Sequence, residues 1–308
     1  MPSIALATSI ADIDTDVDLP LLALACRCAG IDARTLAWDD ATVSWCRFDA
    51  VLIRSTWNYT ERPAEFLSWC ARVDRVTTLL NPLAVLRWNT DKHYLAALGS
   101  AGIPIVPSVF VEPDAEPLPA LRAFLERHSS AEYVVKPAIS AGARDTLRYS
   151  RGQEFAASNH IARLLDQGRS ALVQPYQASV DTIGETGLVY LDGIFSHAIR
   201  KGPLLNADTE DTASAIEQIT PREPSRDELD LAEAVLIAAF RILAPVEPLA
   251  YARIDLVRDP QGQPRLLELE LTEPSLFLAQ AAGSAEHFAR RLAARLDEGY
   301  VRARMGGP

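Results

Sequence analysis

The sequence predicts a mixed α/β protein in which an N-terminal parallel-sheet domain precedes two α+β subdomains. The chain has 308 residues, which is too long for one ordinary domain. Its composition, 48% hydrophobic and 23% charged, is typical of a globular protein with a sizeable core. Strand and helix patterns alternate over residues 3–73 and give way to hairpin patterns further along. We place the three domains at 1–88, 89–172 and 173–308.

Short apolar runs and intervening helical segments define the N-terminal domain. We expect strands at 3–8, 31–36 and 49–54 and helices at 19–29 and 63–73. Such an alternation indicates a parallel sheet with helices on its faces. Ligands of these sheets gather at the carboxyl ends of the strands.

Two polar clusters lie at such strand ends. Arg54 ends the third strand and could clamp a carboxylate with both guanidinium nitrogens, and Ser55 follows it, so we expect both to bind substrate. A purely structural role for Arg54 has about equal support. Asp12, Asp14 and Asp16 follow the first strand, and helix capping in a solvated loop is the favoured interpretation for them.

The rest of the chain divides into shorter elements. Helices are expected at 82–88, 91–99, 118–128, 153–167, 227–243 and 285–301. Strands are expected at 108–111, 133–137, 147–149, 171–176, 187–191, 193–200, 249–258 and 264–271, with a hairpin turn at Asp192-Gly193. Residues 202–222 are polar and poorly periodic, which predicts a mobile loop.

The last two strands carry the most informative pattern. With Gln261-Gly262 at the turn of a hairpin, Asp255 falls opposite Glu268 and Arg253 falls opposite Glu270. Side chains alternate along a strand, so these four share one face, and the opposite face receives five apolar side chains: Ile254, Leu256, Leu267, Leu269 and Leu271.

Three carboxylates on one sheet face repel one another, and one arginine does not neutralise them. A divalent cation would, and carboxylate oxygens suit Mg²⁺. We therefore expect Asp255, Glu268 and Glu270 to be metal ligands. The alternative is a solvent-facing strand with ordinary cross-strand ion pairs.

Lys136 strengthens the case for a phosphate ligand. It ends an apolar strand, and the small-residue loop 140–146 follows, so its ammonium group and the loop amides could meet phosphates. Lys92 offers a second cation. The order of a Walker A motif is absent.

Taken in order and spacing, these segments resemble the ATP-grasp superfamily over about residues 80–278. The matching segments are Lys92, Val135-Lys136-Pro137 with loop 140–146, Val173-Gln174-Pro175-Tyr176, Arg253-x-Asp255 and Glu268-Leu269-Glu270. The resemblance implies an ATP-grasp fold with ATP and Mg²⁺ as cofactors.

The resemblance also implies a role for each matching residue. Lys92 and Lys136 would contact the nucleotide phosphates, beneath a flap at 140–146 that includes Gly142. The hinge with Gln174 and Tyr176 would read adenine, and Asp181 would hold the ribose. The remaining roles fall to the hairpin: Arg253 would touch the transferring phosphate and the metal ligands would be Asp255, Glu268 and Glu270. Two departures matter, because the family usually has Asn at the position of Glu270 and several glycines in the flap.

A narrower resemblance concerns four phrases: Arg54-Ser55-Thr56-Trp57-Asn58-Tyr59, Trp88-Asn89-Thr90-Asp91-Lys92, His197-Ala198-Ile199-Arg200-Lys201 and Glu273-Pro274-Ser275-Leu276. They are similar to the branch that contains the cyclo-ligase of cycloserine biosynthesis. This implies that the carboxylate of O-ureido-serine is activated as an acyl phosphate and that an internal nitrogen closes the ring. The alternatives are a ligase that joins two separate substrates and a nucleotide-binding protein without turnover.

Strand 193–200 supplies further candidates. Arg200 and Lys201 could bind phosphate or substrate, and we expect Arg200 to act in catalysis; an exposed cationic strand end is the alternative. We expect His197 to contact substrate, although a packed histidine is the commoner case.

Charge and localisation signals exclude several classes of partner. A net charge of −11 argues against general affinity for nucleic acid or anionic membrane. The sequence shows neither a secretory signal nor a long uncharged apolar run, and the four cysteines form no CxxC pair, so a cytoplasmic location is expected. The expected partner is a small amino-acid-like molecule, and a homodimer is expected by analogy.

Overall fold

The computed structural model describes residues 1–205, 218–245 and 248–305, with the side chains of 298–305 left out. The central part of the expected mobile loop, residues 206–217, lies outside the described residues. Three sheets organise the described chain, and the mixed α/β class is confirmed. None of the described helices is both long and apolar enough to cross a membrane.

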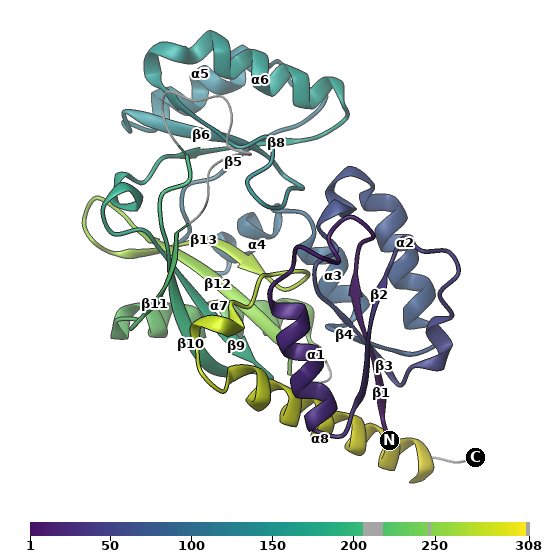
Figure 1. Cartoon of the computed structure of the whole chain (residues 1–308). Coiled ribbons are helices and arrows are strands. Elements are labelled where there is room, and N and C mark those ends of the chain that lie inside the picture. Colours follow the sequence, from purple (N-terminus) through teal and green to yellow (C-terminus); the bar gives the residue numbers. More distant parts are fainter. Residues whose placement is uncertain (206–217, 246–247, 306–308) are drawn as a thin grey trace.

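The N-terminal sheet is parallel throughout, as predicted, with strand order β2-β1-β3-β4 (Figure 1). Its strands are β1 Ser3–Thr8, β2 Asp32–Ala37, β3 Ala50–Ile53 and β4 Thr78–Leu80, with α1 Asp18–Cys28, η1 Trp45–Arg47, η2 Trp57–Glu61 and α2 Pro63–Asp74 between them. β1 and β3 are buried along nearly their whole length, which explains their continuous apolar sequences. The short strand β4 was not predicted.

The central sheet is antiparallel, with strand order β5-β8-β6-β7. Its elements are α3 Leu83–Asn89, α4 Tyr94–Ser100, β5 Val109–Val111, α5 Pro117–Arg127, β6 Glu132–Pro137, β7 Leu147–Ser150, η3 Arg151–Gln153, α6 Glu154–Asp166 and β8 Ala171–Pro175. Figure 1 shows α5 and α6 on the outer face of this sheet. The expected boundary at 172 falls inside β8.

The C-terminal sheet is antiparallel, with strand order β11-β10-β9-β12-β13. Its elements are η4 Ala178–Asp181, β9 Glu185–Leu191, β10 Ile194–Lys201, β11 Ile219–Arg222, α7 Arg226–Leu243, β12 Tyr251–Arg258, β13 Pro264–Glu270, η5 Leu278–Gln280 and α8 Ser284–Met305. The prediction of a loop was wrong for β11, which pairs with β10. Pro221 is compatible with this strand because β11 lies at the sheet edge.

The hairpin of β12 and β13 has the predicted pairs at its functional end. Arg253 lies opposite Glu270 and Asp255 lies opposite Glu268. A bulge follows Asp255, and from there Leu256 pairs with Leu266. The extra residue is Leu267, so the side chains before and after it do not follow one uninterrupted alternation.

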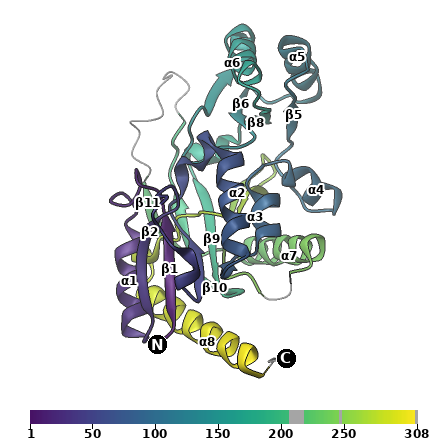
Figure 2. The same ribbon diagram turned by 90° about the vertical axis from the view of Figure 1, so that its right-hand side faces the viewer.

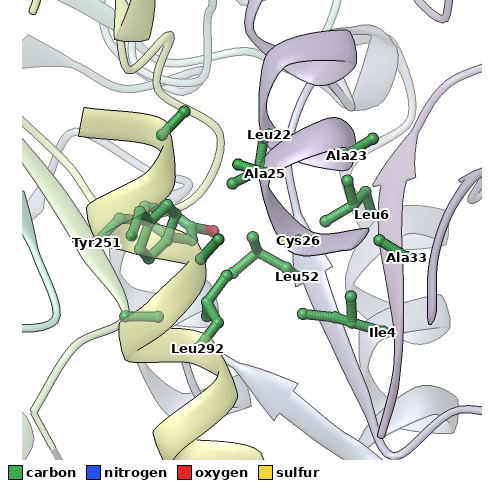
Figure 3. Close-up of a cluster of buried hydrophobic side chains, with 14 of the residues drawn as sticks. Ile4, Leu6, Leu22, Ala23, Ala25, Cys26, Ala33, Leu52, Tyr251 and Leu292 are labelled. Atoms are coloured by element: carbon green, nitrogen blue, oxygen red, sulfur yellow. The ribbon is translucent and has the colours of Figure 1, made fainter. Parts of the chain in front are cut away.

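The C-terminal helix completes the N-terminal core. Leu292 and Phe288 of α8 share one buried cluster with Leu22 of α1 and with Ile4 and Leu52 of the parallel sheet. Figure 3 shows Leu292 and Tyr251 facing the side chains of α1 and of the sheet. In Figure 2 α8 lies against α1 at one end of the molecule, with α5 and α6 at the other. The first and last elements of the chain therefore form one packed layer.

Candidate active site

A cavity of about 500 Å³ lies where the three sheets approach one another. The N-terminal domain contributes Trp57 and Tyr59, and the central domain contributes Lys92, β6, the flap 140–146 and the end of β8. The C-terminal domain contributes β12, β13 and the loop 273–277. The lining combines apolar, aromatic and charged side chains.

The three predicted metal ligands meet in this cavity. Oxygens of Asp255, Glu268 and Glu270 lie within 4.8 Å of one another. All three project from the same face of the hairpin because the bulge begins only after Asp255. An all-oxygen donor set of this size fits Mg²⁺, which usually takes one or two carboxylates and completes its shell with water and phosphate oxygens.

Basic side chains surround these carboxylates more closely than the sequence indicated. Arg253 donates from Nε and Nη2 to the two Asp255 oxygens, at 2.9 Å each, and from Nη2 to Glu270 at 2.5 Å. Lys136 Nζ donates to Glu268 at 2.6 Å, and Lys92 Nζ lies 3.9 Å from the same carboxylate. Lys201 Nζ lies 3.3 Å from Asp255. Three lysines thus join Arg253 as counterions of the acidic cluster, whereas the hairpin sequence had indicated Arg253 alone.

The pKa values of the three carboxyls separate accordingly. Burial would raise the pKa of Glu268, but the ammonium groups of Lys136 and Lys92 hold it well below its usual range. Burial would also raise the pKa of Asp255, and Arg253 and Lys201 hold it low. Burial and repulsion by the other two carboxylates raise the pKa of Glu270 to about 7 despite Arg253. Glu270 is thus the carboxylate whose charge the protein compensates least.

Gly187 leaves the space that Asp255 occupies. It lies opposite Asp255 in the sheet, and a Cβ added there would stand 3.1 Å from Asp255 Oδ1 and 2.9 Å from a side-chain carbon of Ile199. A side chain at this position would therefore press on the carboxylate.

The two predicted phosphate lysines lie side by side under the flap. Lys92 Nζ donates to the backbone oxygen and the hydroxyl of Ser140, both at 3.0 Å. The flap adopts left-handed backbone at Gly142, Ala143 and Asp145, with φ of 62°, 56° and 52°. Its single glycine therefore does not prevent a strongly curved loop, because non-glycine residues take the same conformation at a cost.

The flap also touches the N-terminal domain. Arg144 Nη1 donates to Glu61 at 2.8 Å, and Arg144 itself lines the cavity. In this structure the flap therefore spans the opening between the central and N-terminal domains.

One end of the cavity is an apolar slot. Val134, Tyr176, Val180 and Val257 form a buried cluster there, and Leu267 packs against it. The prediction that Leu267 projects to the opposite face was wrong, because the bulge turns it to the side of Val257, and Leu266 takes its expected place. A flat apolar slot of this kind suits a heterocyclic base.

The hinge residues lie beside this slot, but Asp181 does not line the cavity. Gln174 donates to Ser108 Oγ at 2.9 Å and Tyr176 donates to Asp181 at 2.5 Å. The guanidinium of Arg148 stacks 3.6 Å from the centroid of the Tyr176 ring and pairs with Asp181 at 3.0 Å. In this structure the carboxylate of Asp181 is thus engaged with Arg148 and Tyr176.

Besides Asp181, four predicted site residues do not line the cavity. Arg54 is 1% exposed and donates from Nη2 to the Pro274 backbone oxygen at 2.8 Å, while Ser55 Oγ bonds to Thr8. His197 is buried, and its Nε2 lies 2.9 Å from the Leu276 oxygen. Arg200 donates from Nε to the Ile183 oxygen at 2.7 Å. Direct contact of these four with a ligand has no support from their positions.

Lys201, the residue after Arg200, lies in the cavity at the position that we expected for Arg200. Successive residues of β10 point to opposite faces, so only one of the two reaches the cavity. Lys201 pairs with Glu185 in the sheet register and by an ion pair of 3.1 Å. The opposite charges of Lys201 and Glu185, which face each other across the two strands, were the sequence signal that could have identified Lys201.

Arg54 and His197 instead hold the loop that follows β13. Trp57 Nε1 donates to the Glu273 oxygen at 3.0 Å, and Arg253 Nη1 donates to the Ser275 oxygen at 2.9 Å. The Asp18 carboxylate accepts bonds from three successive amides, those of Leu276, Phe277 and Leu278, at 2.7, 2.8 and 2.7 Å. No sequence pattern pointed to Asp18, since its partners lie about 260 residues away.

These bonds fix an unusual backbone at Phe277. Its φ is 50°, a left-handed conformation that is costly for a bulky residue. The ring lies 5.4 Å from the guanidinium carbon of Arg253 and lines the cavity. The loop therefore forms a hydrogen-bonded wall of the cavity beside Arg253.

Comparison with known proteins gives several matches. Residues 4–81 match the family model described as the N-terminal domain of the D-cycloserine synthetase DcsG. The chain is 43% identical, over 96% of its length and 99% of the relative's, to the cycloserine biosynthesis protein DcsG of Streptomyces lavendulae. A crystal structure of D-cycloserine synthetase DcsG matches with a TM-score of 0.89 and 42% identity, covering 96% of this chain and 99% of that one.

More distant structures share the fold. The ATP-grasp ligase PsnB, solved with a precursor variant, Mg and ADP, matches at 17% identity and a TM-score of 0.62, covering 97% of this chain and 98% of that one. The D-alanine–D-alanine ligase of Bacillus anthracis matches at 14% identity and a TM-score of 0.65, covering 98% of both chains.

Proposed function

The chain belongs to the DcsG family of ATP-grasp ligases, and from that premise we propose that it activates the carboxylate of O-ureido-serine with ATP and closes it to cycloserine. The relatives named for cycloserine synthesis support cycloserine as the product, and the solved ligase with Mg and ADP supports the nucleotide and the metal. The observation that carries the proposal is the cluster of Asp255, Glu268 and Glu270 with four basic side chains, in a cavity that also holds an apolar slot and the loop 273–277.

The nucleotide occupies the apolar end. Its base lies in the slot of Val134, Tyr176 and Val180 next to the hinge, and its phosphates extend towards Lys92 and Lys136 under the flap. When bound, Mg²⁺ held by Asp255, Glu268 and Glu270 neutralises phosphate charge and orients the phosphoryl group. The acidic cluster and the lysines thus exchange their present ion pairs for the nucleotide and its metal.

In the first step, a carboxylate oxygen of the substrate attacks the γ-phosphorus of ATP. A phosphorus–oxygen bond forms, the bond to the β,γ-bridging oxygen breaks, and ADP leaves. Lys136 and Arg253 stabilise the charge spread over the phosphoryl oxygens in the transition state. The product of this step is an acyl phosphate.

In the second step, the ureido nitrogen bound to oxygen attacks the acyl carbonyl carbon. The carbon–nitrogen bond closes the five-membered ring, phosphate leaves with the carbonyl–oxygen bond electrons, and the nitrogen loses its proton. The ring nitrogen still carries the carbamoyl group at this point. After ring closure, water adds to the carbamoyl carbon, the bond between that carbon and the ring nitrogen breaks, the nitrogen takes up a proton, and carbon dioxide and ammonia leave, which gives cycloserine. Water would hydrolyse the acyl phosphate, so the flap must exclude it. The hydrogen bond from Arg144 to Glu61 supports this role, because it joins the flap to the N-terminal domain.

The roles expected for Arg54, His197 and Arg200 change with their positions in the structure. We propose that Arg54 and His197 act through the loop 273–278 and that Lys201 replaces Arg200 as the cation of β10 at the reacting groups. Asp181 as the ribose ligand and a homodimer stay predictions.

The test is an ADP-release assay with ATP, Mg²⁺ and O-ureido-serine, with products identified by mass spectrometry. We expect one ADP per cyclised molecule, and Asp255→Asn should reduce turnover to background. A product that contains a second added amine would identify a ligase of two substrates. Nucleotide binding without ADP release with any tested amino acid would overturn the proposal in favour of a protein without turnover.

A further inference from the structure

Among the described residues, five carboxyl groups line the cavity, and Glu273 differs from the other four. Asp255, Glu268 and Glu270 pair with the basic residues described above, and Glu185 pairs with Lys201. Within the described part of the chain, no basic side chain lies within 4.0 Å of the Glu273 carboxyl. Among the described residues, the structure thus gives four of the cavity carboxylates an ion pair and gives Glu273 none.

The surroundings of Glu273 hold it in place without neutralising it. The Tyr59 hydroxyl lies next to its carboxyl group and favours the charged form, and Trp57 Nε1 donates to its backbone oxygen at 3.0 Å. Tyr59 is 2% exposed, so its hydroxyl is fixed by packing. The rings of Trp57, Tyr59 and Phe277 line the same end of the cavity, and aromatic faces attract cations.

The position of Glu273 matches the geometry of an amino acid. Glu273 follows the metal-ligand candidate Glu270 by three residues, and the backbone of Ser275 is bonded to Arg253. A carboxylate that reacts beside Arg253 therefore places its α-carbon close to the loop 273–277. The ammonium group of an amino acid is attached to that carbon and needs an acceptor there.

We infer that Glu273, oriented by Tyr59, binds the α-ammonium group of the substrate and selects amino acids over simple carboxylates. The inference rests on the proposed function, since it assumes a carboxylate substrate at Arg253. Burial and repulsion by Glu270 raise the pKa of Glu273 to about 8, which agrees with a carboxyl group that becomes fully charged only next to a ligand cation.

The experiment compares two substrates in wild type and Glu273→Gln. One is O-ureido-serine, and the other is 3-(ureidooxy)propanoate, which has the same carboxylate and ureido group but no ammonium. Glu65→Gln, which removes a charge from an exposed position on α2, serves as the matched control. Binding of cycloserine, which keeps the ammonium group, is measured by calorimetry in parallel.

For Glu273→Gln we expect the KM of O-ureido-serine to rise roughly 10- to 100-fold, as for loss of a hydrogen bond to a charged group. The KM of ATP and the kinetics with 3-(ureidooxy)propanoate should stay within about twofold, and Glu65→Gln should match wild type. Tyr59→Phe should shift the KM of O-ureido-serine in the same direction by a smaller factor.

The inference would be overturned if Glu273→Gln lost equal activity with O-ureido-serine and 3-(ureidooxy)propanoate, or if its preference between these two substrates equalled that of wild type. Calorimetry separates it from the proposed function. If the wild type binds cycloserine but releases no ADP, the proposed function fails, and weaker binding by Glu273→Gln still supports the ammonium site. If Glu273→Gln binds cycloserine as tightly as wild type, or if wild type does not bind it at all, the ammonium site is refuted.

Discussion

Replacement of Asp18 by asparagine tests whether the loop 273–278 depends on a single carboxylate. In the structure one oxygen of Asp18 accepts from Leu276 and Phe277, and the other accepts from Leu278. An asparagine has one acceptor oxygen, so its best orientation keeps the first two bonds and turns an N–H group towards the amide of Leu278. One buried donor is then unpaired, and the two remaining bonds lose their charge.

The energetic cost follows from these contacts. An unpaired buried amide costs about 1–3 kcal/mol, and weakening of the two remaining bonds adds about 1 kcal/mol. The free energy of unfolding should therefore fall by about 2–4 kcal/mol. Because left-handed backbone costs about 1–2 kcal/mol at a residue such as Phe277, the weakened loop should relax to another conformation.

Relaxation of the loop should weaken binding of the amino-acid substrate and leave binding of ATP unchanged. We expect the KM of the amino-acid substrate to rise at least about tenfold, by analogy with loss of one charge-assisted contact, while the KM of ATP stays within about twofold. Denaturant unfolding gives the stability, and ADP release at a temperature well below the melting transition gives both KM values. Asp14→Asn is the control, since Asp14 lies exposed four residues earlier.

Two results would refute this reasoning. Stability within about 0.5 kcal/mol of wild type would mean that water or a backbone shift replaces the lost acceptor. Equal increases in both KM values would mean that Asp18 supports the whole cavity and not the loop.

Three further predictions concern other parts of the structure. Glu268→Gln should abolish metal-dependent ADP release and also lower the apo stability by about 2 kcal/mol, because Lys136 and Lys92 lose their carboxylate; retained turnover would contradict the metal assignment. Burial lowers the pKa of His160 to about 4, so the unfolded chain, with a pKa near 6.5, takes up the proton first as the pH falls. Stability should therefore decrease below pH 6.5, and between pH 7 and 5 denaturant titrations should show a loss about 2 kcal/mol smaller in His160→Gln than in wild type; equal losses would exclude His160. Ala143→Gly should raise the melting stability by up to about 1 kcal/mol because it removes left-handed strain, whereas Ala141→Gly in the same flap, where φ is not positive, should lower it; the same sign for both would refute the strain.

The sequence predicted those parts of the site that depend on strand alternation. Asp255, Glu268 and Glu270 converge because a period of two places them on one face, and Lys136 arrives from another strand whose end was recognisable. The bulge at Leu267 was not predictable, since a one-residue insertion leaves the apolar pattern of the strand almost unchanged.

The alternation of apolar and polar residues did not predict which way the side chains at the strand ends point. Arg54 was predicted to face a ligand, but Tyr251, whose ring centroid lies 5.5 Å away, and the Pro274 oxygen hold its guanidinium in the interior. Similarly, β4 and β11 were missed because one has three residues and the other contains Pro221. In these cases the tertiary partners, which no local window contains, decide the outcome.

The packing of α8 on α1 has a consequence for biosynthesis on the ribosome. Domains usually fold in order as the chain emerges, at about 5–20 residues per second. Here Phe288 and Leu292 complete the core around Leu22 and Ile4, so the first domain waits for residues made more than 250 positions later. During that interval the apolar face of α1 has no covering helix. We expect the nascent chain to need chaperones in this period, and a chain stalled before residue 284 to be recognised and degraded although its entire cavity lining has been synthesised.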